Sequence, residues 1–191
     1  MPEVLINYLA LLGWSPGGDR EQFDRAFICE HFGLDRIVKS PAKFDRAKLL
    51  AFNLDAIQAM DDDQFVLRLQ AFCQDFEPLF LEAMTAHQFK VFAIANKARS
   101  KTFRDPIDSG RFFIEADDTI EWPASKAVRK ALCKGEVCGF DRLAAVRDLL
   151  AACDPWTPSQ IELLLTTWAE ENCSGNLGQV AQPIRVAVSG G

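Results

Sequence analysis

The sequence predicts an all-α protein, and three observations lead to this prediction. Apolar residues recur at spacings of three and four in one segment after another, as they do along the buried face of a helix. Many of these segments follow an aspartate, serine or threonine that can cap a helix, and several end before glycine. Alternation of apolar and polar residues, which indicates strands, is nearly absent, and residues 111–114 are the only weak strand candidate.

Three helices are predicted within residues 1–60. Residues 2–12 place their apolar side chains along one face, and Gly13 ends this helix. Asp24 can cap a short second helix, which we expect to end at Gly33. Asp45 can cap a third helix, whose apolar face comes from leucine and phenylalanine side chains.

The next segment predicts three further helices. The run Asp61–Asp63 precedes the first of them, and carboxylates are favourable at the positive end of a helix dipole. Pro78 suits the first turn of the second helix, where a backbone N–H has no intrahelical partner. Residues 89–96 are expected to form the third, which continues through a basic stretch.

The last part of the chain predicts three more helices. Residues 125–133 and 141–153 have helical spacing of their apolar side chains. Thr157 and Gln160 have the spacing of a capping box, with proline just inside it, so a helix is expected from there to about Glu171. The connections between these elements are short, and no repeat or low-complexity tract is present.

Composition excludes several classes of protein. The chain has 191 residues, of which 49% are hydrophobic, so it can bury a core and is not disordered throughout. Its formal charge of −6 excludes a protein that coats nucleic acid through bulk positive charge. No apolar run approaches the roughly 18 residues that a membrane-spanning helix needs. The first residues lack the basic and apolar regions of a signal peptide, so we expect a cytoplasmic protein.

Charge is strongly segregated along the chain. Residues 54–82 contain seven acids and one base, whereas residues 83–104 contain five bases and no acid. A second basic run follows Pro123 and consists of Lys126, Arg129, Lys130 and Lys134. An acidic chain with a concentrated basic stretch can bind nucleic acid locally. Composition alone favours the simpler interpretation, which is a solvated helix face.

The residue pattern offers no catalytic or metal centre. Six cysteines are scattered without a C-x-x-C pair, which favours free and mostly buried thiols. His31 and His87 lack partners at ligand spacing, and the Asp61–Asp63 run lacks the spacing of a calcium loop. Neither a Gly-x-Ser-x-Gly elbow nor a phosphate-binding loop ending in Gly-Lys-Ser/Thr is present. The four tryptophans are expected to anchor the core.

Two long stretches carry a specific family resemblance. Residues 2–15, PEVLINYLALLGWS, resemble the segment of bacterial glutamyl-tRNA synthetases that reads close to PEALLNYLALLGWS. Residues 39–45, KSPAKFD, and residues 178–187, GQVAQPIRVA, follow in the order and at the separation found in that family. The resemblance implies the helical-cage anticodon-binding architecture of a class I aminoacyl-tRNA synthetase. It divides the chain into a stem-contact region at 1–60 and two anticodon-binding subdomains at 61–121 and 122–191.

The resemblance also implies what this chain contributes to a longer enzyme. The family's nucleotide-binding fold precedes this segment, and family members continue beyond Gly191, which would leave the second subdomain truncated. The full enzyme uses ATP and Mg²⁺ to attach glutamate to tRNA-Glu, whereas we expect this segment alone to be inactive and to bind neither cofactor. The same resemblance fits a parent that also charges tRNA-Gln. We expect a monomer that binds no DNA and no membrane.

The resemblance assigns roles to individual side chains. An arginine at the position of Arg99 faces the first anticodon base, and Gln182 and Arg185 match residues that face the middle base. Arginine presents a planar fork of donors, and glutamine presents a donor and an acceptor, so both suit the exposed edges of unstacked bases. Neighbouring cations would hold phosphates without reading sequence: Lys97, Lys101 and Arg104.

Two alternatives stay open from the sequence. The chain fits a helical protein–protein interaction module without RNA binding, with the acidic residues 54–82 and exposed tryptophans as its interface. Arg185 also fits a structural role at a helix end. One departure from the family is local: family members often have aromatic and glycine residues after Asn53, where this chain has Leu54-Asp55-Ala56.

Overall fold

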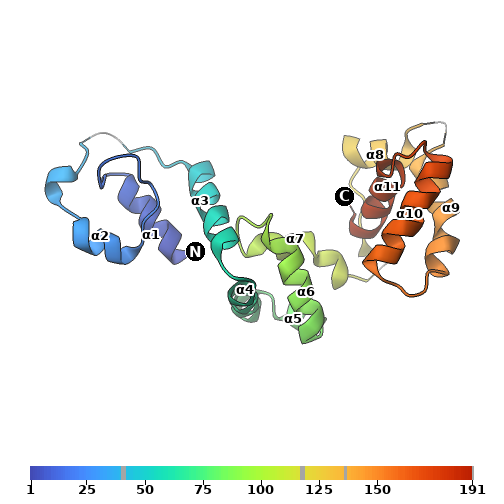
Figure 1. Ribbon diagram of the computed structural model, residues 1–191, viewed down its shortest axis with the longest axis horizontal. Helices are drawn as coiled ribbons and strands as arrows, with labels where there is room; N and C mark the ends of the chain where they lie inside the picture. Colours follow the sequence, from blue (N-terminus) through green and yellow to red (C-terminus); the bar gives the residue numbers. More distant parts are fainter. Residues whose placement is uncertain (40–41, 117–118, 136, 191) are drawn as a thin grey trace. The chain divides into compact units, whose positions relative to one another are not determined.

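A computed structural model of the chain describes residues 1–39, 42–116, 119–135 and 137–190. Within these residues every regular element is a helix, and the only β-type pairing is an isolated bridge between Trp14 and Ile37. The all-α prediction is therefore confirmed. The chain forms two compact units, Met1–Ser109 and Gly110–Gly191, whose helices are labelled in Figure 1.

The described part of the first unit contains seven α-helices and one 3₁₀-helix. They are α1 (Pro2–Leu11), α2 (Arg25–His31), η1 (Leu34–Arg36), α3 (Arg46–Ala59), α4 (Asp62–Phe76), α5 (Pro78–Glu82), α6 (Ala86–Lys97) and α7 (Arg104–Ser109). The carboxylates of Asp24, Asp45 and Asp61 accept backbone N–H bonds at the starts of α2, α3 and α4. These three caps confirm the starts expected from the sequence, since each satisfies a donor that the first turn leaves unpaired.

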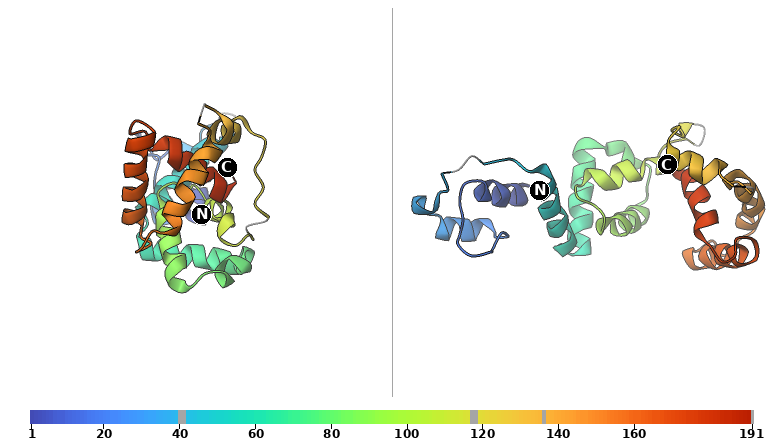
Figure 2. Two further views of the ribbon diagram at one scale, coloured as in Figure 1. Left: turned by 90° about the vertical axis from the view of Figure 1, so that its right-hand side faces the viewer. Right: turned by 90° about the horizontal axis from the view of Figure 1, so that it is seen from above.

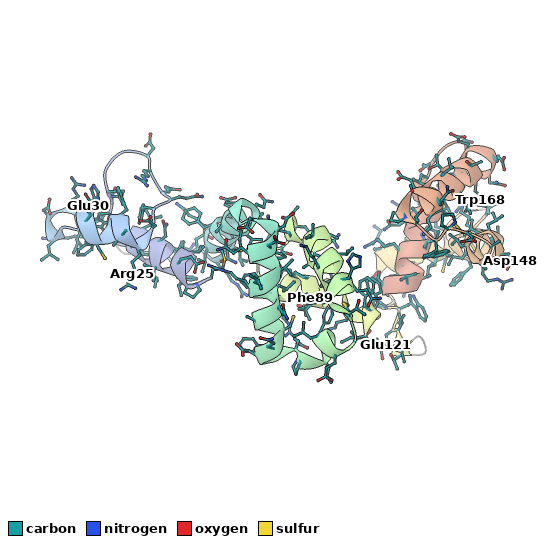
Figure 3. The ribbon with its side chains drawn as sticks, turned by 60° about the horizontal axis from the view of Figure 1, so that its bottom comes forward. Arg25, Glu30, Phe89, Glu121, Asp148 and Trp168 are labelled. Atoms are coloured by element: carbon teal, nitrogen blue, oxygen red, sulfur yellow. The ribbon has the colours of Figure 1, made fainter. Side chains whose placement is uncertain are left out.

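The first unit contains two packed groups of helices. Helix α1 packs against α2 and α3, and the buried ring of Trp14 meets Phe23 edge to face at 5.6 Å between ring centroids. Helix α4 packs against α5 and α6, where the side chains of Phe65 and Phe80 are fully buried. Phe89, labelled in Figure 3, adds α6 to the same core.

The second unit is organised around its last helix. It contains η2 (Arg111–Phe113), α8 (Lys126–Cys133), α9 (Gly139–Ala151), α10 (Pro158–Asn172) and α11 (Gly178–Ser189). Helix α11 packs against α8, α9 and α10 (Figures 1 and 2). Val180 joins α11 to the α9–α10 core, beside which Trp168 packs (Figure 3), and Val186 joins it to a core with α8. Burial of this face leaves the opposite side of α11 to solvent.

The observed secondary structure differs from the interpretation of the sequence at three places. Residues 111–114 form no strand, because η2 and the turn after it use hydrogen bonds between near neighbours in the chain. The helix predicted at 89–96 does not continue through the basic stretch, since α6 ends at Lys97 and a turn leads to α7. Helix α11 was not expected, because Gly178 and Pro183 both disfavour helix by propensity.

The cysteines and tryptophans also differ from expectation. All six cysteines are free, as predicted, but only Cys73 and Cys173 are buried, so the thiols are not mostly buried. Trp14 is the only buried tryptophan, whereas 49% of Trp122 and 63% of Trp156 are exposed. Both residues lie outside the helices, and Trp122 donates from Nε1 to the Val186 carbonyl oxygen of α11 at 3.0 Å. Among the described residues, no helix combines the length and the apolar character needed to cross a lipid bilayer.

The predicted division by function does not follow the division into compact units. The position near residue 60 lies within the first unit, at the end of α3, and the position near residue 121 lies within the second. The three-part division therefore stays a prediction about contacts with RNA. Ser40 and Pro41 of the KSPAKFD motif and the terminal Gly191 lie outside the described residues.

Candidate nucleic-acid interface

Arg99 lies in the turn that links α6 to α7, and a buried asparagine holds it there. Asn96 donates from Nδ2 to the carbonyl oxygen of Phe92 at 2.8 Å. Its Oδ1 accepts from Nε and Nη2 of Arg99 at 3.1 and 2.5 Å, and from the Ser109 hydroxyl at 3.3 Å. Arg99 is exposed, and a guanidinium has five N–H donors, so three N–H groups are not used by Asn96.

The turn itself is fixed by side chains on both sides. The Asp105 carboxylate accepts from the backbone N–H groups of Lys101 and Thr102 at 2.7 and 3.1 Å. Asn53 of α3 donates its side-chain amide to the Lys101 carbonyl oxygen, which ties the turn to the N-terminal helices. An open pocket of about 340 Å³ beside the turn is lined by Asn96, Arg99, Ser100, Lys101, Asp105 and Ser109. The backbone is therefore rigidly held while Lys101 projects from the surface.

Lys97 and Arg104 are occupied by carboxylates of the acidic segment. The Lys97 ammonium donates to the Asp62 carboxylate at 2.8 Å and to the Met60 carbonyl oxygen, and its side chain is only 14% exposed. Arg104 pairs with Glu77 and, at 3.0 Å, with Asp108. Of the three cations expected on phosphates, only Lys101 makes no side-chain ion pair among the described residues.

Lys97 is therefore expected to stabilise the first unit. Its replacement in Lys97→Met should lower the free energy of unfolding by about 1–2 kcal/mol, because a half-buried carbonyl and a carboxylate lose their charged donor. Urea unfolding measures this loss. The matched change Lys101→Met removes an exposed cation and should alter stability by less than about 0.5 kcal/mol. Equal small effects of the two changes would contradict the structural role of Lys97.

Gln182 and Arg185 lie next to each other on the exposed side of α11. They are three residues apart, a spacing that brings side chains together on a helix surface. Their buried neighbours Val180, Pro183 and Val186 face the core, and neither polar side chain bonds to another described residue. Arg185 precedes the last turn of α11, which contains no basic residue, so the helix-end role considered from the sequence finds no support.

A groove of about 690 Å³ lies beside Gln182, between α8, α9 and α11. Lys130 and Lys134 line one part of it, and Arg142 and Gln179 line another. Arg142 donates from Nη2 to the Gln179 side-chain oxygen at 2.8 Å, while its buried Nε has no partner. The groove thus offers several donors, and no carboxylate lines it among the described residues.

The sequence did not predict the roles of three residues that hold the site in place: Asn96, Asp105 and Arg142. Asparagine and aspartate often lie a few residues from a basic side chain. Whether such a residue hydrogen-bonds to the neighbouring backbone or side chains depends on where the helix ends. The Thr102-x-x-Asp105 spacing is the one local sequence signal for the role of Asp105. A hydroxyl and a carboxylate three residues apart are typical of a turn that leads into a helix, and here the Thr102 hydroxyl donates to the Asp105 carboxylate. Arg142 acquires its neighbour Gln179 only through the packing of α9 on α11.

Other reactive groups do not gather into a site. His31 and His87 are both exposed. Burial, with a smaller contribution from the Glu77 carboxylate, raises the pKa of the Cys73 thiol to about 11, so it is protonated at neutral pH. Within the described parts of the chain, no three His, Cys, Asp or Glu side chains are placed to hold a metal ion.

Comparison with protein families finds a match to the larger part of the chain. Residues 64–191 match the family model described as "Anticodon binding domain", which covers more than half of the chain. The matched segment includes Arg99, Gln182 and Arg185.

Curated relatives match along the whole chain. The glutamate–tRNA ligase of Corynebacterium efficiens is 31% identical over 193 residues, and glutamate–tRNA ligase 2 of Rhodospirillum rubrum is 34% identical over 191 residues. Each match covers 100% of this chain, but only 38% and 39% of the respective relatives. The chain therefore spans about two fifths of the length of these relatives.

Solved structures share the fold. A glutamate tRNA ligase from Elizabethkingia meningosepticum, crystallised with its amino acid, aligns with a TM-score of 0.74 at 23% identity, over 99% of this chain and 35% of that one. The glutamate-tRNA synthetase of Elizabethkingia anophelis aligns with a TM-score of 0.71 at 22% identity. Both alignments confirm that the helical architecture is the one found in this group of proteins.

Proposed function

The chain belongs to the anticodon binding domain family, and on this premise we propose that it is the tRNA-binding and anticodon-recognition portion of a glutamate–tRNA ligase. The observation that carries the proposal is the match of the whole chain to glutamate–tRNA ligases at 31% and 34% identity. The parent enzyme would attach glutamate to tRNA-Glu. Binding of the purified chain to tRNA-Glu, compared with tRNAs that carry other anticodons, tests the proposal.

We assign a different contact with tRNA to each of the three predicted regions. Residues 1–60 contact the tRNA stem, and residues 61–121 and 122–191 form the two anticodon-binding subdomains. The family match from residue 64 onward supports the assignment of the second and third regions. Arg99 and the pair on α11 lie in different compact units, so each subdomain would bring its own base-reading side chains.

Base reading rests on three exposed side chains. Arg99 would face the first anticodon base, and Gln182 with Arg185 would face the middle base. Anticodon bases are unstacked, so their hydrogen-bonding edges are free to meet a guanidinium fork or an amide. Two features support this proposal: Asn96 orients the Arg99 guanidinium, and Gln182 and Arg185 keep their hydrogen-bonding groups unused by described residues.

Lys101 is proposed to contact a phosphate. Replacing it in Lys101→Ala should weaken binding to all tRNAs equally and reduce the slope of log affinity against log salt by about 0.7–0.9, the value for one lost phosphate contact. Fluorescence titration across a salt series measures both quantities. An unchanged slope would remove Lys101 from the interface. Lys97 and Arg104 should contribute less, because each would first have to leave a carboxylate.

The rest of the enzyme's chemistry is proposed to lie outside this chain. ATP and Mg²⁺ would act in the nucleotide-binding portion of the parent. We assign no step of the reaction to the residues of this chain. We propose that the parent acts in the cytoplasm, with tRNA-Glu as its partner.

A protein–protein module is not favoured as the alternative. Its interface would be the acidic segment 54–82 and exposed tryptophans. Trp122 and Trp156 are exposed, but Asp62, Asp63 and Glu77 of the acidic segment pair with basic side chains of the same unit. The segment therefore presents less free negative charge than its sequence suggests.

A further inference from the structure

The second unit carries positive charge that the proposed function has not used. Four cations follow the Ser125 cap, on helix α8 and just beyond its end: Lys126, Arg129, Lys130 and Lys134. None of their side chains makes an ion pair or hydrogen bond with a described residue. In the first unit, by contrast, Lys90, Lys97 and Arg104 are paired with carboxylates.

These cations occupy one face of α8. Lys126, Arg129 and Lys130 have the i, i+3, i+4 spacing that brings side chains onto the same side of a helix, and Lys134 follows one turn later. The opposite face buries Val128 and Leu132 in the core with α11. Packing therefore forces the cations outward, where a shallow depression of about 430 Å³ runs between them.

The depression on α8 joins the groove beside the base-reading pair. Lys130 and Lys134 line both of them. Gln182 lines the groove on its α11 side, and Arg142 lines it from α9. The path from α8 to Gln182 thus presents ammonium, guanidinium and amide donors, and no carboxylate among the described lining residues.

Arg142 adds an unsatisfied donor to the wall of the groove. Its side chain lines the groove, and its Nε is buried and has no hydrogen-bond partner among the described residues. An unpartnered buried donor is unfavourable, so nearly all such groups in proteins find an acceptor in the protein, in water or in a ligand. Gln179 already occupies Nη2 and orients the guanidinium.

We propose that the cationic face of α8 and the adjoining groove bind the phosphates of the RNA strand that flank the base read by Gln182 and Arg185. Phosphate oxygens are acceptors only, which suits a path lined by donors, and charge-assisted bonds to them are strong. This surface supplies more of the salt-dependent affinity than the basic stretch 97–104, where Lys97 and Arg104 are already paired with carboxylates. The inference rests on the proposed function.

The test uses the double change Lys130→Ala/Lys134→Ala in the full chain. Binding to tRNA-Glu and to an anticodon-swapped tRNA is titrated across a salt series. The slope of log affinity against log salt should fall by about 1.4, for two lost contacts to a single strand. A fourfold rise in salt should then weaken the variant about sevenfold less than the wild type. The ratio between the two tRNAs should not change.

Two control variants remove cations elsewhere in the chain. Lys97→Ala/Arg104→Ala removes two cations from the first unit and should change the slope by less than half as much. Arg147→Ala removes a cation of α9 that pairs with its neighbour Asp148 and lines neither the depression nor the groove, so it should leave the slope unchanged. Circular dichroism and urea unfolding establish that each variant is folded.

The outcomes separate the inference from the function it rests on. If the wild type discriminates between the tRNAs but the slope of the double variant is unchanged, the inference is wrong and the proposed function stands. If the variant loses affinity for tRNA-Glu alone, the two lysines read bases, which also overturns the inference. If the wild-type chain binds neither tRNA at low salt, the proposed function itself fails.

Discussion

Replacing Arg185 with alanine should lower affinity for tRNA-Glu by about 1–3 kcal/mol and relax discrimination between anticodons. The reason is geometric: Arg185 sits beside Gln182 on the exposed side of α11, and no described residue uses its donors. Loss of the guanidinium removes hydrogen bonds to a base edge, and the correct base loses more than a wrong one. Titration of the variant against matched and anticodon-swapped tRNAs measures both effects.

The control for this prediction is Arg147→Ala in the same unit. Arg147 is exposed and pairs with the adjacent Asp148, labelled in Figure 3, so its loss changes the net charge without touching α11. It should leave the ratio of affinities unaltered. If Arg185→Ala weakens binding to every anticodon equally, Arg185 contacts the backbone and does not read a base.

Replacing Gly139 with alanine should destabilise the chain by about 1–3 kcal/mol. Gly139 begins α9, where it passes so close to α8 that an added Cβ would lie 2.1 Å from the Ala131 carbonyl oxygen and 2.8 Å from the Leu132 Cα. Both contacts are with backbone, so α8 itself must move. Urea unfolding measures the loss, and tRNA binding should weaken with it because α8 carries the cationic face.

Gly178→Ala provides the matched control for the change at Gly139. Gly178 begins α11, but an added Cβ there would meet only the flexible Asn176 side chain, at 3.2 Å. Alanine is also the better helix former, so stability should change by less than about 0.5 kcal/mol. Equal stability of the two alanine variants would show that α8 and α9 do not approach as closely as described.

The sequence predicts most helices because their starts are local. Asp24, Asp45, Asp61 and Thr157 each cap a helix with their own side chains, and a cap needs only residues three positions away. Helix α11 has no such signal: its first residue is glycine and Pro183 lies inside it. Its stability comes from the burial of Val180 and other side chains against three neighbouring helices, which no local pattern reveals.

The candidate site is predicted less completely than the fold. A resemblance identifies Arg99, Gln182 and Arg185, and the structure places all three at the surface. The segregation of charge along the chain also indicates the basic stretch 97–104 as a candidate site. The sequence does not reveal that Asp62 and Glu77 form ion pairs with Lys97 and Arg104 of this stretch when the helices pack. Pairing between distant segments decides which cations are free, so this part of the site requires the structure.

The central claim is that this chain reads an anticodon. The most direct test is binding of the purified chain to tRNA-Glu and to the same tRNA with a swapped anticodon, measured across a salt series. We predict salt-sensitive binding to both, with tighter binding to tRNA-Glu at every salt concentration. Equal affinity for the two tRNAs, or no binding at low salt, would contradict the claim.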